Sequence, residues 1–226
     1  IIYPEIDDNI LHYLDDDGSF VEPIYYLPII PMILVNGTKG IGTGFSTDIM
    51  SYNPLQIINY LEGLLNNFDE VKQKTLTIHP YYKGFKGKII PCDTNNKKYL
   101  IKGCYEVISK DKIRITELPI GSWTQDYKEF LESLLTLSKD KDKDKDKTKS
   151  KKTSEILIKD YNDMSTDINV EFEVTFVPGG FSKLIMQKHE NGIDGIEKYL
   201  KLITTQSTTN MHLFNEKEQL RKYEDV

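Results

Sequence analysis

The side chains that most often carry covalent or metal chemistry are scattered along this sequence. No Ser/His/Asp, Cys/His or metal-ligand spacing surrounds any histidine, and the four stand apart: His12, His79, His189 and His212. Cys92 and Cys104 form no C-x-x-C pair, which argues against zinc and favours a reducing compartment. We therefore expect no catalytic residue and no metal site within these 226 residues.

Glycine spacing singles out one short segment. Four glycines surround a single large apolar residue, Ile41, in the stretch Asn36-Gly37-Thr38-Lys39-Gly40-Ile41-Gly42-Thr43-Gly44. Because glycine has no side chain, a ligand can approach the backbone closely at such positions. The spacing therefore favours a contact surface made by backbone and by one apolar side chain.

Three interpretations of this segment compete. A dinucleotide-type phosphate loop needs a helix after its glycines, but Phe45 and polar residues follow here, and no Walker lysine precedes a Ser or Thr. A tight turn would pack Ile41 into the hydrophobic core. A wedge would expose Ile41 on a glycine-flanked hairpin, where it could enter between base pairs and kink DNA by unstacking them.

The elements before and after this segment are predicted from periodicity and from start and stop signals. The spacing of apolar residues predicts an amphipathic helix over 6–16, and the apolar run 32–35 predicts a buried strand that leads into the glycines. A helix should begin at Pro54, with Asn53 as its N-cap, and end at 66–67.

The rest of the sequence, from residue 87 onwards, predicts strands first and then helices and strands together, which is an α+β pattern. Ser122 and Gln125 have capping-box spacing at the start of a helix whose apolar side includes Trp123. The ranges are antiparallel strands 87–91, 98–102 and 112–116, a helix 122–137, strands 156–158 and 169–177, and helical pieces 181–188 and 192–202.

Charge by itself does not suggest a nucleic-acid binder. The net charge is −6, so any phosphate contact must come from local basic or hydroxyl groups. The run Lys139 to Lys152 alternates Lys with Asp and has no apolar residue, which predicts a disordered insertion at 139–153. No apolar stretch is long enough to span a membrane, so we expect no membrane contact.

Four motifs together resemble the tower region of eukaryotic-type DNA topoisomerase II. They keep the order and spacing seen in that family over nearly the whole chain, and the Pro-Met-Ile-Leu-Val-Asn-Gly part is also similar to bacterial gyrase A subunits. The motifs are Glu22-Pro23-x-x-Tyr26-x-Pro28-Ile29-Ile30-Pro31-Met32, Asn36-Gly37-x-x-Gly40-Ile41-Gly42-Thr43-Gly44, Tyr82-Lys83-Gly84-Phe85-Lys86-Gly87 and Glu117-Leu118-Pro119-x-x-x-Trp123-Thr124-Gln125-x-Tyr127-Lys128-Glu129.

The resemblance implies a fold and a set of DNA contacts. Residues 1–29 would end a winged-helix DNA-gate domain, and 30–226 would form a β-rich tower domain with antiparallel strands and flanking helices. Ile41 would intercalate into the gate DNA and bend it, held by Asn36, Gly40, Gly42 and Thr43, with Lys39 near phosphate. The stretch 201–210 looks like the family's DNA-contacting segment, with Lys201, Thr204, Thr205, Thr209 and Asn210 as contacts.

Two of these assignments keep a plain alternative. The stretch 201–210 reads equally well as a polar connector. Trp123 is a further candidate for a DNA contact, although a lone Trp more often anchors a core.

The parent activity implied is ATP-dependent passage of one duplex through a transient double-strand break in another. In the family this is done by a nuclear homodimer that uses ATP and Mg²⁺ and changes DNA topology, as chromosome segregation requires. The tyrosine nucleophile is expected upstream of Ile1, so no catalytic residue, ATP site or metal site is expected here, and the double-stranded gate DNA is the partner. The alternative is a stand-alone, non-enzymatic DNA-bending or protein-interaction module.

Overall fold

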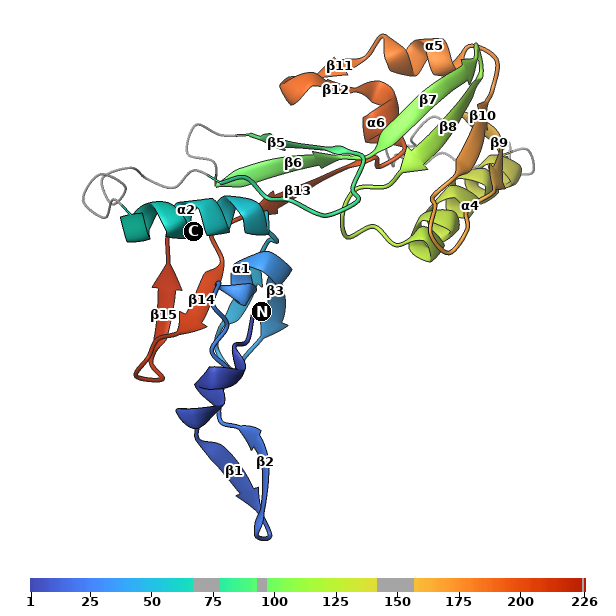
Figure 1. The fold of residues 1–226 in the computed structure, drawn as a ribbon. Helices are drawn as coiled ribbons and strands as arrows, with labels where there is room; N and C mark the ends of the chain where they lie inside the picture. The colour runs from blue at the N-terminus through green and yellow to red at the C-terminus, as the bar shows by residue number, and fades with distance from the viewer. Residues whose placement is uncertain (67–77, 93–96, 142–156, 225) are drawn as a thin grey trace. The chain divides into compact units, whose positions relative to one another are not determined.

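The computed structural model describes residues 1–66, 78–92, 97–141, 157–224 and 226. Its architecture is α+β with mostly antiparallel sheets, as the sequence predicts. The chain divides into two compact units (Figure 1): unit 1 comprises Ile1–Lys83 and Thr208–Val226, and unit 2 comprises Gly84–Ser207. The domain boundary expected after residue 29 stays a prediction.

Unit 1 is built largely from hairpins. Its elements are η1 (Glu5–Asn9), β1 (Tyr13–Asp16), β2 (Ser19–Pro23), α1 (Met32–Asn36), β3 (Thr38–Ile41), β4 (Ser46–Ile49), α2 (Pro54–Asn66), β14 (Met211–Phe214) and β15 (Leu220–Tyr223). Helix α2 begins as predicted, because Asn53 Oδ1 accepts the Leu55 N–H at 2.9 Å.

The helix predicted over 6–16 is wrong. Only the short 3-10 turn η1 forms there, and the chain then enters the β1–β2 hairpin. Asp17 and Gly18, with φ of 51° and 86°, make its two-residue turn, and Gly18 N–H donates to Asp15 Oδ1 at 2.7 Å. An Asp-Gly pair between two strands is a strong hairpin signal, and here it overrides the helical spacing.

The buried strand predicted at 32–35 is also wrong. These residues form helix α1, which begins after Pro31, ends before Gly37 and buries none of its side chains fully. A four-residue apolar run cannot distinguish a strand from a helix by periodicity. Pro31 at the start and Gly37 at the end, with φ of 66°, mark a helix instead.

Two larger antiparallel sheets, of three and four strands, lie in unit 2 beside one two-stranded pair. The three-stranded sheet has the order β13 (Ile203–Ser207), β6 (Lys98–Lys102), β5 (Lys88–Pro91), and the four-stranded sheet has the order β7 (Cys104–Ser109), β8 (Lys112–Glu117), β10 (Phe172–Phe176), β9 (Ile158–Asp163). The predicted meander is therefore split between two sheets, and β7 was not predicted. The chain changes sheet at Gly103, where a Cβ would lie 2.3 Å from the Glu117 carbonyl oxygen.

Helix α4 (Thr124–Lys141) covers one face of the four-stranded sheet (Figure 1). It starts later than predicted: Tyr127 N–H donates to the Trp123 carbonyl oxygen, so Ser122 is not the N-cap. The predicted capping box is wrong, since Gln125 Nε2 donates to Glu129 instead. The helix also continues through Lys141, into the first residues of the predicted disordered insertion; residues 142–153 of that insertion lie outside the described residues.

The core of unit 2 lies between this sheet and the helices. Alternate residues of β10 are fully buried, as the predicted alternation requires, and they meet Tyr127 and Leu131 of α4. Tyr127 Oη donates to the Leu200 carbonyl oxygen at 2.8 Å. The helical pieces predicted near the end are α5 (Gly180–Ile185) and α6 (Gly195–Tyr199), separated by β11 (Lys188–His189), η2 (Glu190–Gly192) and β12 (Ile193–Asp194).

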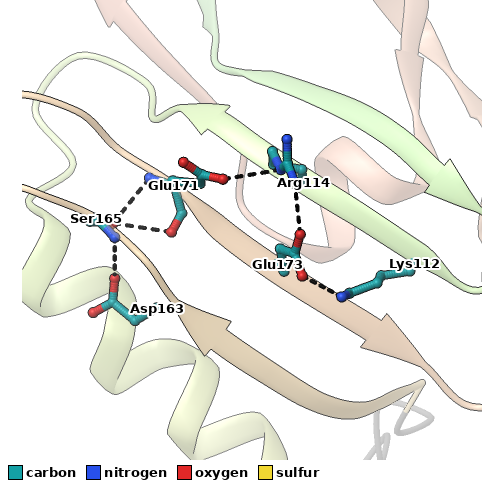
Figure 2. A network of polar contacts seen from close by, with 6 residues as sticks. All are labelled: Lys112, Arg114, Asp163, Ser165, Glu171 and Glu173. Atoms are coloured by element: carbon teal, nitrogen blue, oxygen red, sulfur yellow. Dashed lines mark hydrogen bonds and ion pairs between the residues drawn. The ribbon is translucent and has the colours of Figure 1, made fainter.

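The same sheet also carries a chain of ion pairs between neighbouring strands (Figure 2). Glu173 of β10 pairs with Lys112 and, at 3.0 Å, with Arg114 of β8. Arg114 Nε lies 3.2 Å from Glu171 Oε1 but not in hydrogen-bond geometry. The hydrogen bond from Lys112 and then that from Arg114 lower the pKa of Glu173, so this carboxylate stabilises the fold in its charged form.

Candidate nucleic-acid interface

The glycine-rich segment forms a hairpin in unit 1. Strands β3 and β4 pair antiparallel, with Ile41 opposite Ser46 and Gly40 opposite Thr47. Gly42 N–H donates to the Phe45 carbonyl oxygen at 2.9 Å and closes the turn. A β-strand follows the glycines, not a helix, which agrees with rejecting the phosphate-loop interpretation.

Ile41 lies at the end of β3 with 94% of its surface exposed. The interpretation that packed it into the hydrophobic core is therefore wrong. Exposure of one large aliphatic side chain on a hydrogen-bonded hairpin is the geometry that a wedge requires.

At three of the four glycines, contacts or backbone conformation within the chain itself explain why no larger residue is present. A Cβ at Gly37 would lie 2.6 Å from the Ile49 carbonyl oxygen, a Cβ at Gly42 would lie 2.6 Å from the Phe45 ring, and Gly44 has a φ of +84°. Gly40 has no such reason: its φ is not positive and a Cβ there would meet nothing within 4 Å. Glycine in a strand costs roughly 0.5–1 kcal/mol relative to alanine, so Gly40 is suited to close approach by something outside the chain.

The surface around the hairpin is concave and mixed in polarity. Ligand-binding clefts in proteins usually measure about 300–1,000 Å³, and the cleft here measures ≈ 590 Å³. It is lined by residues of both strands and by Asn210, which precedes β14. The Asp48 N–H donates to the Asn210 carbonyl oxygen at 2.8 Å, and Asn210 Nδ2 donates to Ser46 Oγ at 2.9 Å. Asn210 is thus brought to the hairpin although 169 positions separate it from Ile41 (210 − 41 = 169).

The other hairpin candidates are placed as follows. Thr43 is exposed in the turn, and the exposed Lys39 Nζ lies 3.7 Å from Asp48 Oδ2. Asn36 ends helix α1, where its carbonyl oxygen accepts the Ser51 hydroxyl at 2.8 Å. An ion pair at this distance with an exposed lysine is weak, and the phosphate contact of Lys39 stays a prediction.

The candidates predicted at 201–209 fall on both units. Strand β13 of unit 2 carries Thr204, half-buried, and Thr205, exposed, while the exposed Thr209 belongs to unit 1. Lys201 has a φ of 52° and its Nζ lies 4.2 Å from the Phe130 ring centroid. The segment therefore mixes strand and turn positions, and its assignment as a DNA contact stays a prediction.

Trp123 does not anchor the core. It is 74% exposed, immediately before α4 in unit 2, so the expectation of a buried side chain is wrong. Its assignment as a DNA contact stays a prediction.

Sequence reasoning missed the residues that brace the hairpin. Phe45 and Phe214 meet edge to face, with ring centroids 5.9 Å apart and planes at 87°. The neighbouring Thr47 does not add a hydrogen bond through its side chain, because its Oγ1 is buried without a partner. Alternation of polar and apolar residues over 210–213 is the one signal that could have indicated a strand there.

Three further findings concern metal-ligating side chains, thiol chemistry and membrane-spanning helices in the described part of the chain. Within it, no three His, Cys, Asp or Glu side chains lie close enough together to hold a metal ion. Burial raises the pKa of the Cys104 thiol, which makes the reactive thiolate scarcer. None of the described helices combines the length and the apolar character that crossing a membrane requires.

Comparisons with known proteins agree on one relationship. The family model for the A subunits of DNA gyrase and topoisomerase IV matches residues 1–226. The DNA topoisomerase 2 of Drosophila melanogaster is 38% identical over 223 residues, covering 99% of this chain and 14% of that protein. The DNA topoisomerase 2 of Plasmodium falciparum (isolate K1 / Thailand) is 41% identical over 223 residues, covering 98% of this chain and 14% of its own length.

A solved structure shows the same fold. The crystal structure of the Plasmodium falciparum topoisomerase II DNA-binding, cleavage and re-ligation domain superposes with a TM-score of 0.79 at 40% identity. It covers 99% of this chain, which in turn spans 27% of the solved chain. The chain therefore corresponds to a small part of the length of the proteins that it matches.

Proposed function

The chain belongs to the type II DNA topoisomerase family, as part of the DNA-binding and cleavage region, and on this premise we propose that it bends the gate DNA by inserting Ile41 between base pairs. The observation that carries the proposal is the exposure of Ile41 on a hairpin that backbone hydrogen bonds hold in place. A side chain with no packing role in its own fold is free to pack against a partner.

The energetics of such a wedge are balanced. Unstacking one step costs a few kcal/mol, and a bent duplex recovers that cost because it touches more of the protein. Burial of a whole Ile side chain between bases contributes about 1.5–3 kcal/mol towards the same cost. Gly40 and Gly42 flank Ile41 without side chains, which leaves room for the bases on either side.

Phosphate contacts come from few charges. Lys39 supplies the cation of the hairpin and Thr43 a hydroxyl, while Asn210 lines the neighbouring cleft. Most protein–DNA hydrogen bonds go to phosphate and sugar, and both charged and neutral side chains donate them. An acidic chain can therefore bind DNA through this surface. Thr209 is a further candidate contact in unit 1, and Lys201, Thr204, Thr205 and Trp123 are separate candidates in unit 2.

The parent activity that we propose is ATP-dependent passage of one duplex through a transient double-strand break in another, by a homodimer in the nucleus. In the part of the chain that the structure describes, no cluster of side chains suits Mg²⁺, and the glycine segment does not suit ATP. We therefore assign neither a metal nor a nucleotide step to these residues. Their part in the reaction is to grip and bend the DNA.

A base-stacking probe tests the proposal directly. The full-length protein is titrated into a duplex that carries 2-aminopurine at successive steps of the binding site, because its fluorescence rises when stacking is lost. We expect the rise at one step for the wild type and its loss in Ile41→Ala. An equal rise in both proteins would exclude Ile41 as the wedge.

A further inference from the structure

The hairpin that carries Ile41 is held by a strand from the far end of the chain. Strand β14 lies against β4, and the Asp48 N–H donates to the Asn210 carbonyl oxygen at 2.8 Å. Side chains alternate along an extended segment, so Asn210, His212 and Phe214 project to one side. All three contact β4 or the turn before it.

His212 makes the central contact of this group. Its Nδ1 lies 3.0 Å from the Ser46 carbonyl oxygen and 3.0 Å from Asn210 Oδ1. A carbonyl oxygen can only accept a hydrogen bond, so Nδ1 must carry a proton. That proton also fixes the Asn210 amide, whose oxygen faces His212 and whose Nδ2 donates to Ser46 Oγ at 2.9 Å.

These hydrogen bonds end on the residue across the ladder from the wedge. Ser46 is paired with Ile41, and it is held through its carbonyl oxygen by His212 and through its hydroxyl by Asn210. Next to it, Phe45 packs edge to face on Phe214. The contacts from β14 therefore fix the direction in which the end of β3 points.

We propose that His212 is a positioning residue for DNA bending: its Nδ1–H holds Ser46, and through it the Ile41 hairpin, in the orientation that enters the duplex. The inference rests on the proposed wedge function. His212 itself need not touch DNA. The cost of inserting Ile41 is lower when the hairpin does not have to be ordered during binding.

Paired amide substitutions separate the hydrogen bond from general packing. In His212→Asn the amide nitrogen occupies the position of Nδ1 along the side chain, whereas in His212→Gln it occupies that of Nε2. The Asn variant can still donate to Ser46, and the Gln variant cannot. His212→Phe keeps a flat ring without a donor, and His189→Phe is the matched control in unit 2.

Two measurements on the full-length protein test the proposal. Hydrogen exchange without DNA follows the Gly42 and Asp48 amides, which close the hairpin turn and its bond to β14. Energy transfer across an end-labelled duplex gives the bent fraction. Loss of one hydrogen bond should increase exchange at both amides and reduce the bent fraction about fivefold in the Gln and Phe variants, with Asn and His189→Phe like the wild type.

The outcomes separate this inference from the function that it extends. Wild-type bending in His212→Gln and His212→Phe, with Ile41→Ala still defective, overturns the role of His212 and leaves the wedge. A defect in Asn equal to that in Gln also overturns it, because the defect then follows packing. Wild-type bending in Ile41→Ala removes the wedge function and the positioning role together.

Discussion

Replacing Ile41 by alanine should separate DNA bending from folding more cleanly than any other change in this chain. Ile41 is 94% exposed, and exposed substitutions away from special features change the free energy of unfolding by less than about 0.5 kcal/mol. Ile41 is not among the residues with a positive φ, so alanine can adopt its backbone conformation. We therefore expect the urea midpoint of the variant to equal that of the wild type.

The effect on the bent complex follows from the buried side chain. Ile→Ala removes three carbon atoms, and each buried CH₂ contributes about 0.8 kcal/mol, or roughly 2.4 kcal/mol together. Because about 1.4 kcal/mol corresponds to a factor of ten, the equilibrium between bent and straight complexes should shift by about 50-fold. This value counts only the three carbon atoms removed, because the alanine methyl remains.

Energy transfer between dyes at the two ends of a short duplex measures this equilibrium. The full-length protein is titrated at fixed salt, and the plateau gives the bent fraction while the midpoint gives the affinity. Ile168→Ala is the matched control, because Ile168 is 89% exposed in the loop between β9 and β10. If both variants bend DNA as the wild type does, Ile41 takes no part in bending and the reasoning from its exposure is refuted.

Four further changes probe the interface and the fold. Gly40→Ala should leave folding unchanged or stabilise it by about 0.5 kcal/mol, because a Cβ there meets nothing, while DNA affinity falls about tenfold; wild-type affinity in a filter-binding titration would remove Gly40 from the contact surface. Lys39→Gln should reduce the slope of log Kd against log salt by about one, and an unchanged slope would mean that Lys39 meets no phosphate. Leu131→Ala should lower the free energy of unfolding by about 3 kcal/mol in urea, because Leu131 is fully buried; a loss under about 1 kcal/mol would contradict the described core. For Glu173, whose pKa is lowered in the folded state, the stabilisation is present above the unfolded-state pKa and is lost as pH falls through the folded one. The free energy of unfolding of Glu173→Gln should therefore fall less than that of the wild type on acidification below the ordinary glutamate pKa of 4.5, and parallel falls would show that the ion pairs of Figure 2 are absent in solution.

The elements with strong local signals were predicted correctly from the sequence. Asn53 and Pro54 begin α2 where capping chemistry places them, and the alternation in β10 identified the buried face of the central strand. Both signals act over a few residues, so no knowledge of distant contacts was needed.

The errors arose where two local signals competed or where a distant contact decided the outcome. Apolar spacing at 6–16 favoured a helix, but the turn chemistry of Asp17-Gly18 favoured the hairpin that forms. Ser122 has a suitable side chain and spacing for a cap, yet the chain enters α4 through Trp123 instead. Local propensity decides the secondary structure at such positions only when tertiary packing favours neither alternative.

By itself, the sequence determined the family resemblance, the position of the glycine-flanked Ile41 and the most regular elements, because each depends on residues that are close together in the chain. Only the tertiary structure decided that Ile41 is exposed and that Asn210 and His212 hold its hairpin. Those contacts join segments more than 160 positions apart (210 − 46 = 164). Pairing at such separation depends on the path of the whole intervening chain, which no local pattern of residues records.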